Sequence, residues 1–126
     1  MSGGWAKYAL ERYEKLKMWR NYALIIARSC REVLREGCSK VYVVGGAARG
    51  VLTVLSDIDV VIVVEKEEDK GVDIWLKIKR RAEELGLPLD IPIDLKIYTV
   101  AELRRLRETG IVSEDEMVEV TITPPI

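Results

Sequence analysis

The 126-residue sequence contains no histidine, no glutamine, one asparagine (Asn21) and only two cysteines, Cys30 and Cys38. Without histidine, zinc sites built from His and Cys and catalytic triads built around His are excluded. Two cysteines are too few for a disulfide framework, and since neither has a metal-ligand companion, both are predicted to be free thiols. The scarcity of Asn and Gln beside abundant Glu, Lys and Arg is typical of proteins from hot environments.

Long apolar runs and a strong net charge are also missing. No run reaches the length of a membrane span, and the polar N-terminus lacks the apolar core of a signal peptide, so a cytoplasmic location is expected. The net charge of −1 provides no overall basic field, which makes a long nucleic acid an unexpected partner. Basic clusters at 77–81 and 104–107 have acids among or near them and are interpreted as solvated helix faces.

What is present predicts one domain over residues 1–126, with 48% apolar and 33% charged residues. A long first helix is expected at about 5–36, a core at about 37–110 and a tail at 111–126. Gly37 is expected to end the helix. Apolar residues at alternating three- and four-residue steps form its buried stripe: Leu16, Trp19, Ala23, Ile26, Cys30 and Val33. At roughly 48 Å, this helix exceeds the width of so small a domain, which favours a homo-oligomer.

Three strands and two further helices follow this first helix. Strands are predicted at 41–45, 57–64 and 90–98, and helices from Asp73 to about Leu85 and from a capping box at Thr99 to near Gly110. The tail is ambiguous between a turn capped by Ser113 and an alternating strand at 118–122. The order predicts an α/β or α+β fold, a small mixed sheet with helices packed on it.

Two acids stand at the head of the most apolar predicted strand. Asp57 and Asp59 share one face of that strand, and adjacent carboxylates repel each other unless a cation lies between them. Oxygen ligands on a rigid strand suit Mg²⁺. Asp94 on the next strand would join them if the two strands pair, and three such acids can hold two metal ions. Asp90 lies on the same face as Asp94 and is a rival third ligand.

A pair of glycines precedes these acids. Gly45 and Gly46 follow a buried strand and would let backbone N–H groups approach an anion. A short helical turn is expected to begin after them, and Arg49 in that turn could donate to phosphate oxygens or be a plain surface arginine. Ser56 is either a local cap or a ligand. Lys96, beside Asp94, is interpreted as solvated, although it could reach a triphosphate.

The glycine pair, an interval of ten residues and the Asp-Ile-Asp triplet at 57–59 together resemble the signature of the nucleotidyltransferase superfamily. The sequence is similar to the minimal nucleotidyltransferases over about residues 22–110, and "IDL" at 93–95 matches the position of their third carboxylate. The resemblance implies a palm-like core shared with DNA polymerase beta and kanamycin nucleotidyltransferase. It also implies transfer of a nucleoside monophosphate, with AMP from ATP as the favoured case and the base preference left open, to a hydroxyl with two Mg²⁺ ions, for which Mn²⁺ could substitute. The implied catalytic and metal-binding residues are Asp57, Asp59 and Asp94, and the implied nucleotide-binding residues are Gly45, Gly46, Arg49 and Ser56.

The sequence departs from this pattern at a few positions. Ala47 replaces a polar or basic residue often found after the glycines, and Val51–Leu55 is apolar where such loops are commonly polar. Minimal nucleotidyltransferases often pair with a small helical HEPN-type toxin, for which the apolar loop and the first helix would be the contact surface. The alternative to an enzyme is therefore an antitoxin or binding module, and in either case the resemblance suggests a partner protein.

Overall fold

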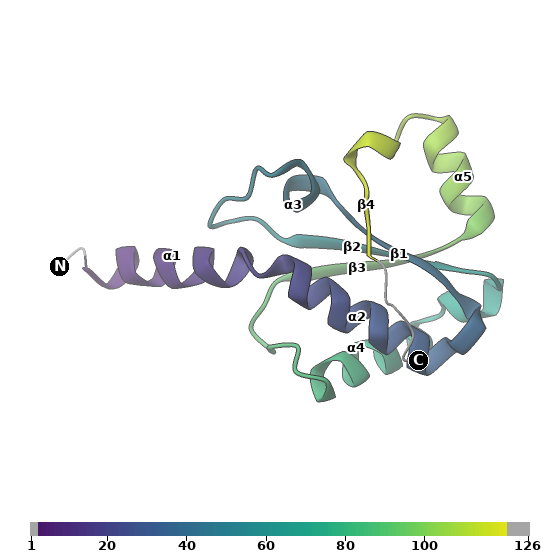
Figure 1. The fold of residues 1–126 in the computed structure, drawn as a ribbon, viewed down its shortest axis with the longest axis horizontal. Helices are drawn as coiled ribbons and strands as arrows, with labels where there is room; N and C mark the ends of the chain where they lie inside the picture. Colours follow the sequence, from purple (N-terminus) through teal and green to yellow (C-terminus); the bar gives the residue numbers. More distant parts are fainter. Residues whose placement is uncertain (1–2, 121–126) are drawn as a thin grey trace, which may run out of the picture.

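Four strands form one mixed sheet at the centre of the computed structural model, which describes residues 3–120 (Figure 1). Their order across the sheet is β3-β2-β1-β4. β1 pairs antiparallel with both β2 and β4, whereas β2 and β3 run parallel. The strands are β1 Cys38–Val44, β2 Ile58–Val64, β3 Ile93–Thr99 and β4 Val118–Glu119.

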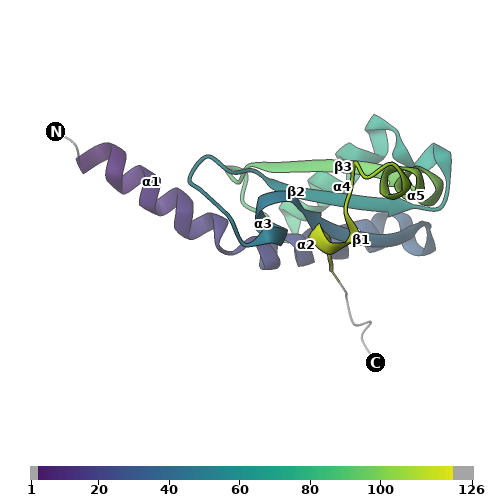
Figure 2. The same cartoon turned by 90° about the horizontal axis from the view of Figure 1, so that it is seen from above.

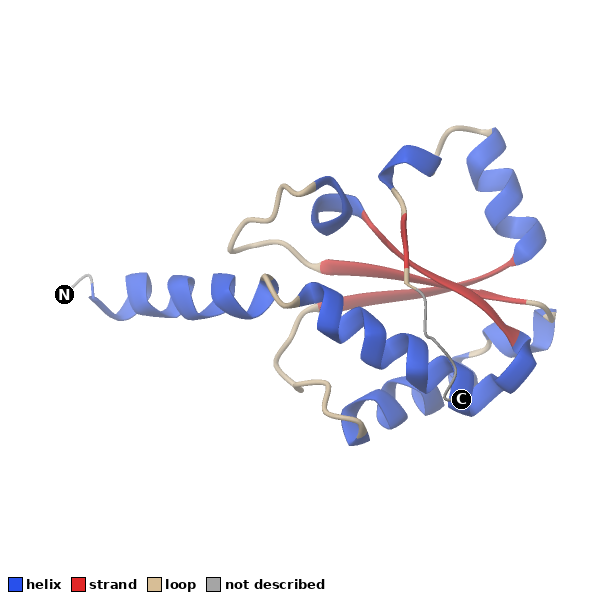
Figure 3. Cartoon of the chain, in the orientation of Figure 1, coloured by secondary structure: helices blue, strands red, loops and turns tan. Residues whose placement is uncertain are grey.

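Residues 3–120 contain five α-helices, of which α1 projects away from the sheet, and each of the first three strands leads into a helical segment (Figure 3). The α-helices are α1 Gly3–Leu16, α2 Trp19–Leu34, α3 Gly45–Arg49, α4 Val72–Glu84 and α5 Val100–Glu108. Short 3₁₀ turns are η1 Arg35–Gly37, η2 Glu67–Lys70 and η3 Glu114–Glu116. This mixed architecture confirms the α/β fold predicted from the sequence.

The two faces of the sheet bury different apolar sets. On β2, Ile58, Val60 and Ile62 pack into the main core with α2 and α4, whereas Val61 and Val63 on the other face contact α5. Because successive side chains of a strand alternate between faces, a strand covered on both sides becomes a continuous apolar run. The same alternation places Asp59 on the α5 face, away from α2 and α4.

The prediction of one continuous helix at about 5–36 is wrong. The structure has two helices there, α1 and α2, separated by a turn at Lys17 and Met18. The Met18 N–H donates to the Lys15 carbonyl three residues back, and the Lys17 N–H donates to the Tyr13 carbonyl four residues back. The hydrogen-bonded turns therefore continue with only a local tightening. The three- and four-residue apolar spacing is undisturbed, so the sequence carries no sign of the break.

Helix α1 projects away from the sheet in both views (Figures 1 and 2). Near its start, Trp5 and Tyr8 are 64% and 55% exposed, and their stacked rings have centroids 5.9 Å apart. The predicted self-association through this helix is not tested by the structure and stays a prediction. Light scattering on the full chain would check it, and the mass of a single chain would contradict it.

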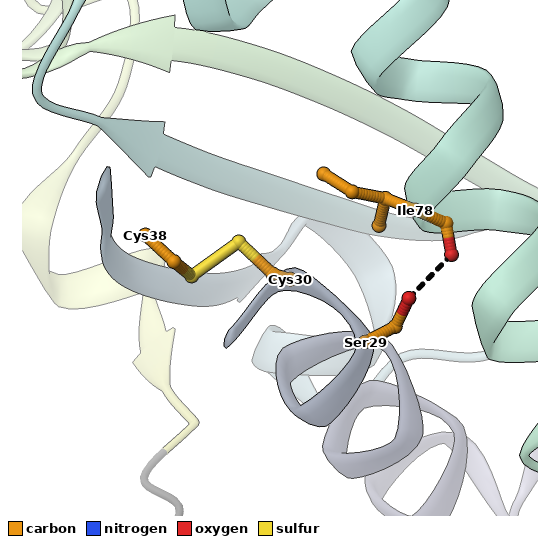
Figure 4. Close-up of a disulfide and its surroundings, with 4 residues drawn as sticks. All are labelled: Ser29, Cys30, Cys38 and Ile78. Atoms are coloured by element: carbon orange, nitrogen blue, oxygen red, sulfur yellow. Dashed lines mark hydrogen bonds between the residues drawn. A yellow bond between two sulfur atoms is a disulfide. The ribbon is translucent and has the colours of Figure 1, made fainter. Parts of the chain in front are cut away.

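The prediction of two free thiols is wrong, because Cys30 on α2 and Cys38 at the start of β1 form a disulfide (Figure 4). Their Cα atoms are 5.9 Å apart, within the usual range for such a bond. The chain reverses through η1, where Arg35 adopts a left-handed φ of 56°. This reversal brings the first residue of β1 beside the last turns of α2, a proximity that the spacing of the two cysteines does not reveal.

Several boundaries differ by a few residues from the sequence prediction. Gly71 occupies the N-cap of α4 and Asp73 lies in its first turn, so Asp73 is not the cap. The third strand begins at Ile93, because residues 89–91 form a turn and Pro92 has no N–H to donate. Asp90 therefore lies outside the strand, where it forms an ion pair with Lys15. The capping box of α5 is confirmed: Thr99 Oγ1 accepts from the Glu102 N–H at 3.2 Å, and Glu102 Oε1 accepts from the Thr99 N–H at 3.0 Å.

The ambiguous tail contains both a turn and a strand. Ser113 precedes η3 without a side-chain capping bond, and Val118–Glu119 then pairs with β1 at the sheet edge. The end of the predicted strand, residues 121–122, lies outside the described residues. No helix found between residues 3 and 120 is long and apolar enough to cross a membrane.

Candidate nucleotide and metal site

Two carboxylates lie side by side where β2 and β3 begin. The parallel register pairs Ile58 with Ile93 and Asp59 with Asp94, so both acids occupy equivalent positions on neighbouring strands. Both are on the face opposite α2 and α4, which leaves them partly exposed instead of buried in the main core. The site predicted from the sequence required β2 and β3 to pair, and this pairing brings the two acids together.

Burial is the main cause of a raised pKa at Asp59. The negative charge of Asp94 raises this pKa further, Asp57 adds a smaller contribution, and the ammonium of Lys96 opposes them. Carboxylates that are partly desolvated and close to one another are stabilised in their charged form by a cation. The site therefore has the electrostatic character that favours cation binding.

Asp57 lies outside the paired strands that hold Asp59 and Asp94. It is exposed and lies in the loop just before β2, where no strand pairing fixes it. Across residues 3–120, no group of three or more Asp, Glu or Cys side chains stands ready to enclose a metal ion. Mg²⁺ rarely uses such a cage, because it is usually held by one or two carboxylates, several waters and substrate phosphates. The donor set of Asp59 and Asp94, with Asp57 nearby, fits that ion.

Gly45 lies directly against this acid pair. It follows Val44, which pairs with Asp59 across β1 and β2, and its φ of +71° is in the left-handed region. A Cβ atom built at Gly45 would collide with the Asp59 carboxylate. At Gly46, a Cβ atom would come within 3.4 Å of the Val51 carbonyl oxygen. The first glycine is therefore required where the backbone passes close to Asp59, whereas a Cβ atom at the second would make an ordinary van der Waals contact.

We predict that Gly45→Ala displaces the Asp59 carboxylate and lowers stability by about 1–3 kcal/mol, because the new methyl group collides and the backbone is strained. Thermal denaturation would measure the stability, and Mn²⁺ titration would report the displaced ligand. Gly50→Ala is the matched control, since Gly50 has a similar φ of +74° but the added Cβ would meet no atom of the described residues within 4 Å. Equal metal affinity in the two variants would contradict the collision with Asp59.

The remaining predicted residues have distinct surroundings. Arg49 is exposed at the end of α3, and no ion pair to it is found within residues 3–120. Ser56 Oγ accepts a hydrogen bond from the Thr53 N–H at 2.8 Å, so this hydroxyl caps a local turn, one of the two roles expected for it. Asp90 is 2.5 Å from Lys15 Nζ and precedes β3, which separates it from the strand-borne acids.

Sequence reasoning missed a basic residue on the same face of the sheet. Arg107 of α5 was assigned to a solvated helix face, but its guanidinium lies over the Tyr42 ring at 5.5 Å from the ring centroid. Its Nε is buried and has no hydrogen-bond partner among residues 3–120, and Nη2 is 3.8 Å from the sulfur of Met117. No pattern in the sequence indicates this contact, since it depends on how α5 packs against β2 and β3 and on the pairing of β1 with β2.

Comparison with known proteins finds a matching family model and a solved structure of similar fold. A family model described as "Nucleotidyltransferase domain" matches residues 26–117, which include the glycine pair and all three predicted acids. The fold is also similar to the 1.40 Å crystal structure of a protein from Sulfolobus solfataricus with a provisional nucleotidyltransferase assignment. The TM-score is 0.50 at 20% identity, over 89% of this chain and 85% of the other. A search of curated proteins finds no match.

Proposed function

This chain belongs to the nucleotidyltransferase domain family, and on that premise we propose that it transfers AMP from ATP to an acceptor hydroxyl in a Mg²⁺-dependent reaction. The observation that carries the proposal is the pairing of Asp59 with Asp94 directly beneath Gly45. Acids for metal ions and a close backbone approach for phosphate are the two requirements of such a transfer.

In this proposal all three acids bind metal, and Asp94 also accepts a proton. Asp57, Asp59 and Asp94 would hold two Mg²⁺ ions, or Mn²⁺ in their place. Bound metal would neutralise phosphate charge and lower the pKa of the attacking hydroxyl. Asp94 accepts the hydroxyl proton as the acceptor oxygen bonds to the α-phosphorus. The bond from that phosphorus to the bridging oxygen breaks, and pyrophosphate leaves with the electron pair.

Other groups of the chain would bind and orient the nucleotide. Backbone N–H groups at Gly45 and Gly46 donate to phosphate oxygens, and Arg49 reaches the same oxygens from the end of α3. The Ser56 hydroxyl holds the loop that leads into Asp57. Because such transfer depends on positioning and electrostatics, histidine is not required.

The proposed acceptor is a hydroxyl on a partner protein. The loop between the glycine turn and Asp57 exposes Val51 and Leu55, the latter at 78%, next to the proposed phosphate site. Arg12 of α1 donates to the Val54 carbonyl and fastens this loop to the first helix. An apolar surface beside the acids would hold an acceptor protein in line with the α-phosphate. The same surface favours the second candidate function, an antitoxin or binding module for a HEPN-type partner.

Calorimetry with ATP tests the proposal first. ATP is expected to bind with Mg²⁺ or Mn²⁺ and not in EDTA, whereas equal binding in EDTA would contradict the metal requirement. Intact-mass measurement of a co-purified partner with ATP and Mg²⁺ then separates the two functions. A gain of adenylate units that is lost with Asp57→Asn supports the enzyme, and a bound but unmodified partner supports the binding module.

A further inference from the structure

The face of the sheet that carries the acid pair also carries a lysine one step further along β3. Asp59 is level with Asp94, and the next pair on this face is Val61 with Lys96. Two residues along a strand correspond to about 6.6 Å, which the four-carbon stem of a lysine easily spans. Lys96 therefore lies on the same face of the sheet as the two carboxylates, next to Asp94 along β3.

The ammonium of Lys96 turns back toward the acids. Its Nζ lies 3.5 Å from Asp94 Oδ2, and the Lys96 and Asp94 side chains are 57% and 44% exposed. Of the lysines and arginines in the described part of the chain, Lys96 alone forms an ion pair with either Asp59 or Asp94. Its positive charge also lowers the pKa of Asp59, which burial and the charge of Asp94 raise. Lys96 is thus the counter-charge that the protein itself supplies to the acid pair.

This counter-charge is easily exchanged. An ion pair that is half exposed contributes little stability, so the ammonium leaves Asp94 at small cost. A divalent cation between the carboxylates would repel the ammonium, and a triphosphate arriving with that cation would attract it. A lysine is a point charge on a flexible stem, which suits a change of partner better than the planar, bidentate arginine.

We propose that Lys96 is an exchangeable counter-ion of the site. Its ammonium pairs with Asp94 and offsets part of the negative charge of the acid pair while no metal is bound, and it pairs with the nucleotide phosphates once metal and nucleotide enter together. The inference rests on the proposed function, because it requires both ligands to bind at these acids. It gives Lys96 a positioning role and predicts that removal of its charge affects the two ligands in opposite directions.

The test uses Lys96→Met in the full chain, which keeps an unbranched apolar stem and removes the charge. Without nucleotide, Mn²⁺ affinity measured from the free-ion EPR signal is expected to rise about three- to fivefold, the range of an exposed charge pair. At saturating Mn²⁺, ATP affinity measured by calorimetry is expected to fall about tenfold, the loss expected for one charge-assisted hydrogen bond. Lys96→Arg keeps the charge and is expected to remain close to the unaltered protein in both measurements.

Lys77→Met on α4 is the matched control, since Lys77 is exposed and belongs to the opposite side of the sheet. It is expected to change neither affinity. If the unaltered chain binds both ligands and Lys96→Met binds Mn²⁺ equally or more weakly, the counter-ion role is overturned while the proposed function stands. If Lys96→Met gains Mn²⁺ affinity without losing ATP affinity, the phosphate contact is overturned. An unaltered chain that binds neither Mn²⁺ nor ATP overturns both proposals.

Discussion

Asp59→Asn is expected to reduce nucleotidyl transfer by about 10³-fold or more, since loss of one preorganised electrostatic group alone typically costs 10²–10³ in rate. Asparagine keeps the shape of the side chain and one oxygen but removes the charge that would hold the metal. Asp59 is the acid that the structure fixes most closely, through pairing with Val44 and Asp94 and contact with Gly45. A radiolabelled ATP transfer assay at saturating Mg²⁺ would measure the loss.

The same substitution is expected to maintain or raise stability in chelator at neutral pH. The pKa of Asp59 is raised in the folded chain, above all by burial and then by Asp94, so the charged form is disfavoured by folding. A raised carboxyl pKa stabilises the folded state at a pH below the unfolded value, and this contribution is lost as pH rises through the folded value. The advantage of Asp59→Asn should therefore appear above the folded pKa and disappear toward pH 3.8.

Thermal denaturation across this pH range provides the measurement, with Asp115→Asn on the exposed η3 turn as the matched control. The control should retain transfer and show none of this pH-dependent gain. If Asp59→Asn instead unfolds at a lower temperature and keeps its activity, Asp59 is a structural residue and the site must be placed elsewhere.

Reduction of the Cys30–Cys38 disulfide is expected to lower the melting temperature by roughly 10 °C. The bond closes a short loop, with a sequence separation of 8, and the chain-entropy relation assigns such a loop about 2.5 kcal/mol. For a domain of this size, each kcal/mol corresponds to about 3–4 °C. Calorimetric scans with and without a phosphine reductant would measure the difference.

Cys38→Ser is the sharper form of this experiment, because Cys38 is only partly buried whereas Cys30 is inaccessible to solvent. The variant should melt near the temperature of the reduced protein and should not respond to further reductant. Two thiols that titrate in the denatured, unreduced chain would contradict the disulfide.

The parts of the fold that depend on neighbouring residues were predictable from the sequence. Both faces of β2 are covered, so this strand is a continuous apolar run that is recognisable in the sequence. The capping box of α5 is recognisable because its two residues, Thr99 and Glu102, are only three positions apart. The alternation of β3 gave the correct face for Asp94. Its position beside Asp59 could be predicted only on the assumption that β2 and β3 pair, because the sequence of neither strand specifies that parallel pairing.

What the sequence did not predict depends on distant contacts. Cys30 and Cys38 meet only after the reversal at Arg35, and Arg107 reaches Tyr42 only because α5 packs against the sheet. Asp90 likewise meets Lys15 of the first helix, 75 residues away in sequence, whereas Asp94 lies level with Asp59; Asp94 as the third metal ligand stays a prediction. In each case the local pattern suited two environments, and tertiary structure selected one.

The direct passage from β3 into α5 has a mechanical consequence. Thr99 is both the last residue of the strand and the N-cap of the helix, and its two capping hydrogen bonds leave no flexible linker between them. Asp94 and Lys96 on β3 are therefore connected to α5 through Thr99 without a loop between strand and helix. We expect a ligand that displaces α5 to act on β3 as well, since the turns of residues 109–113 lie only at the other end of this helix.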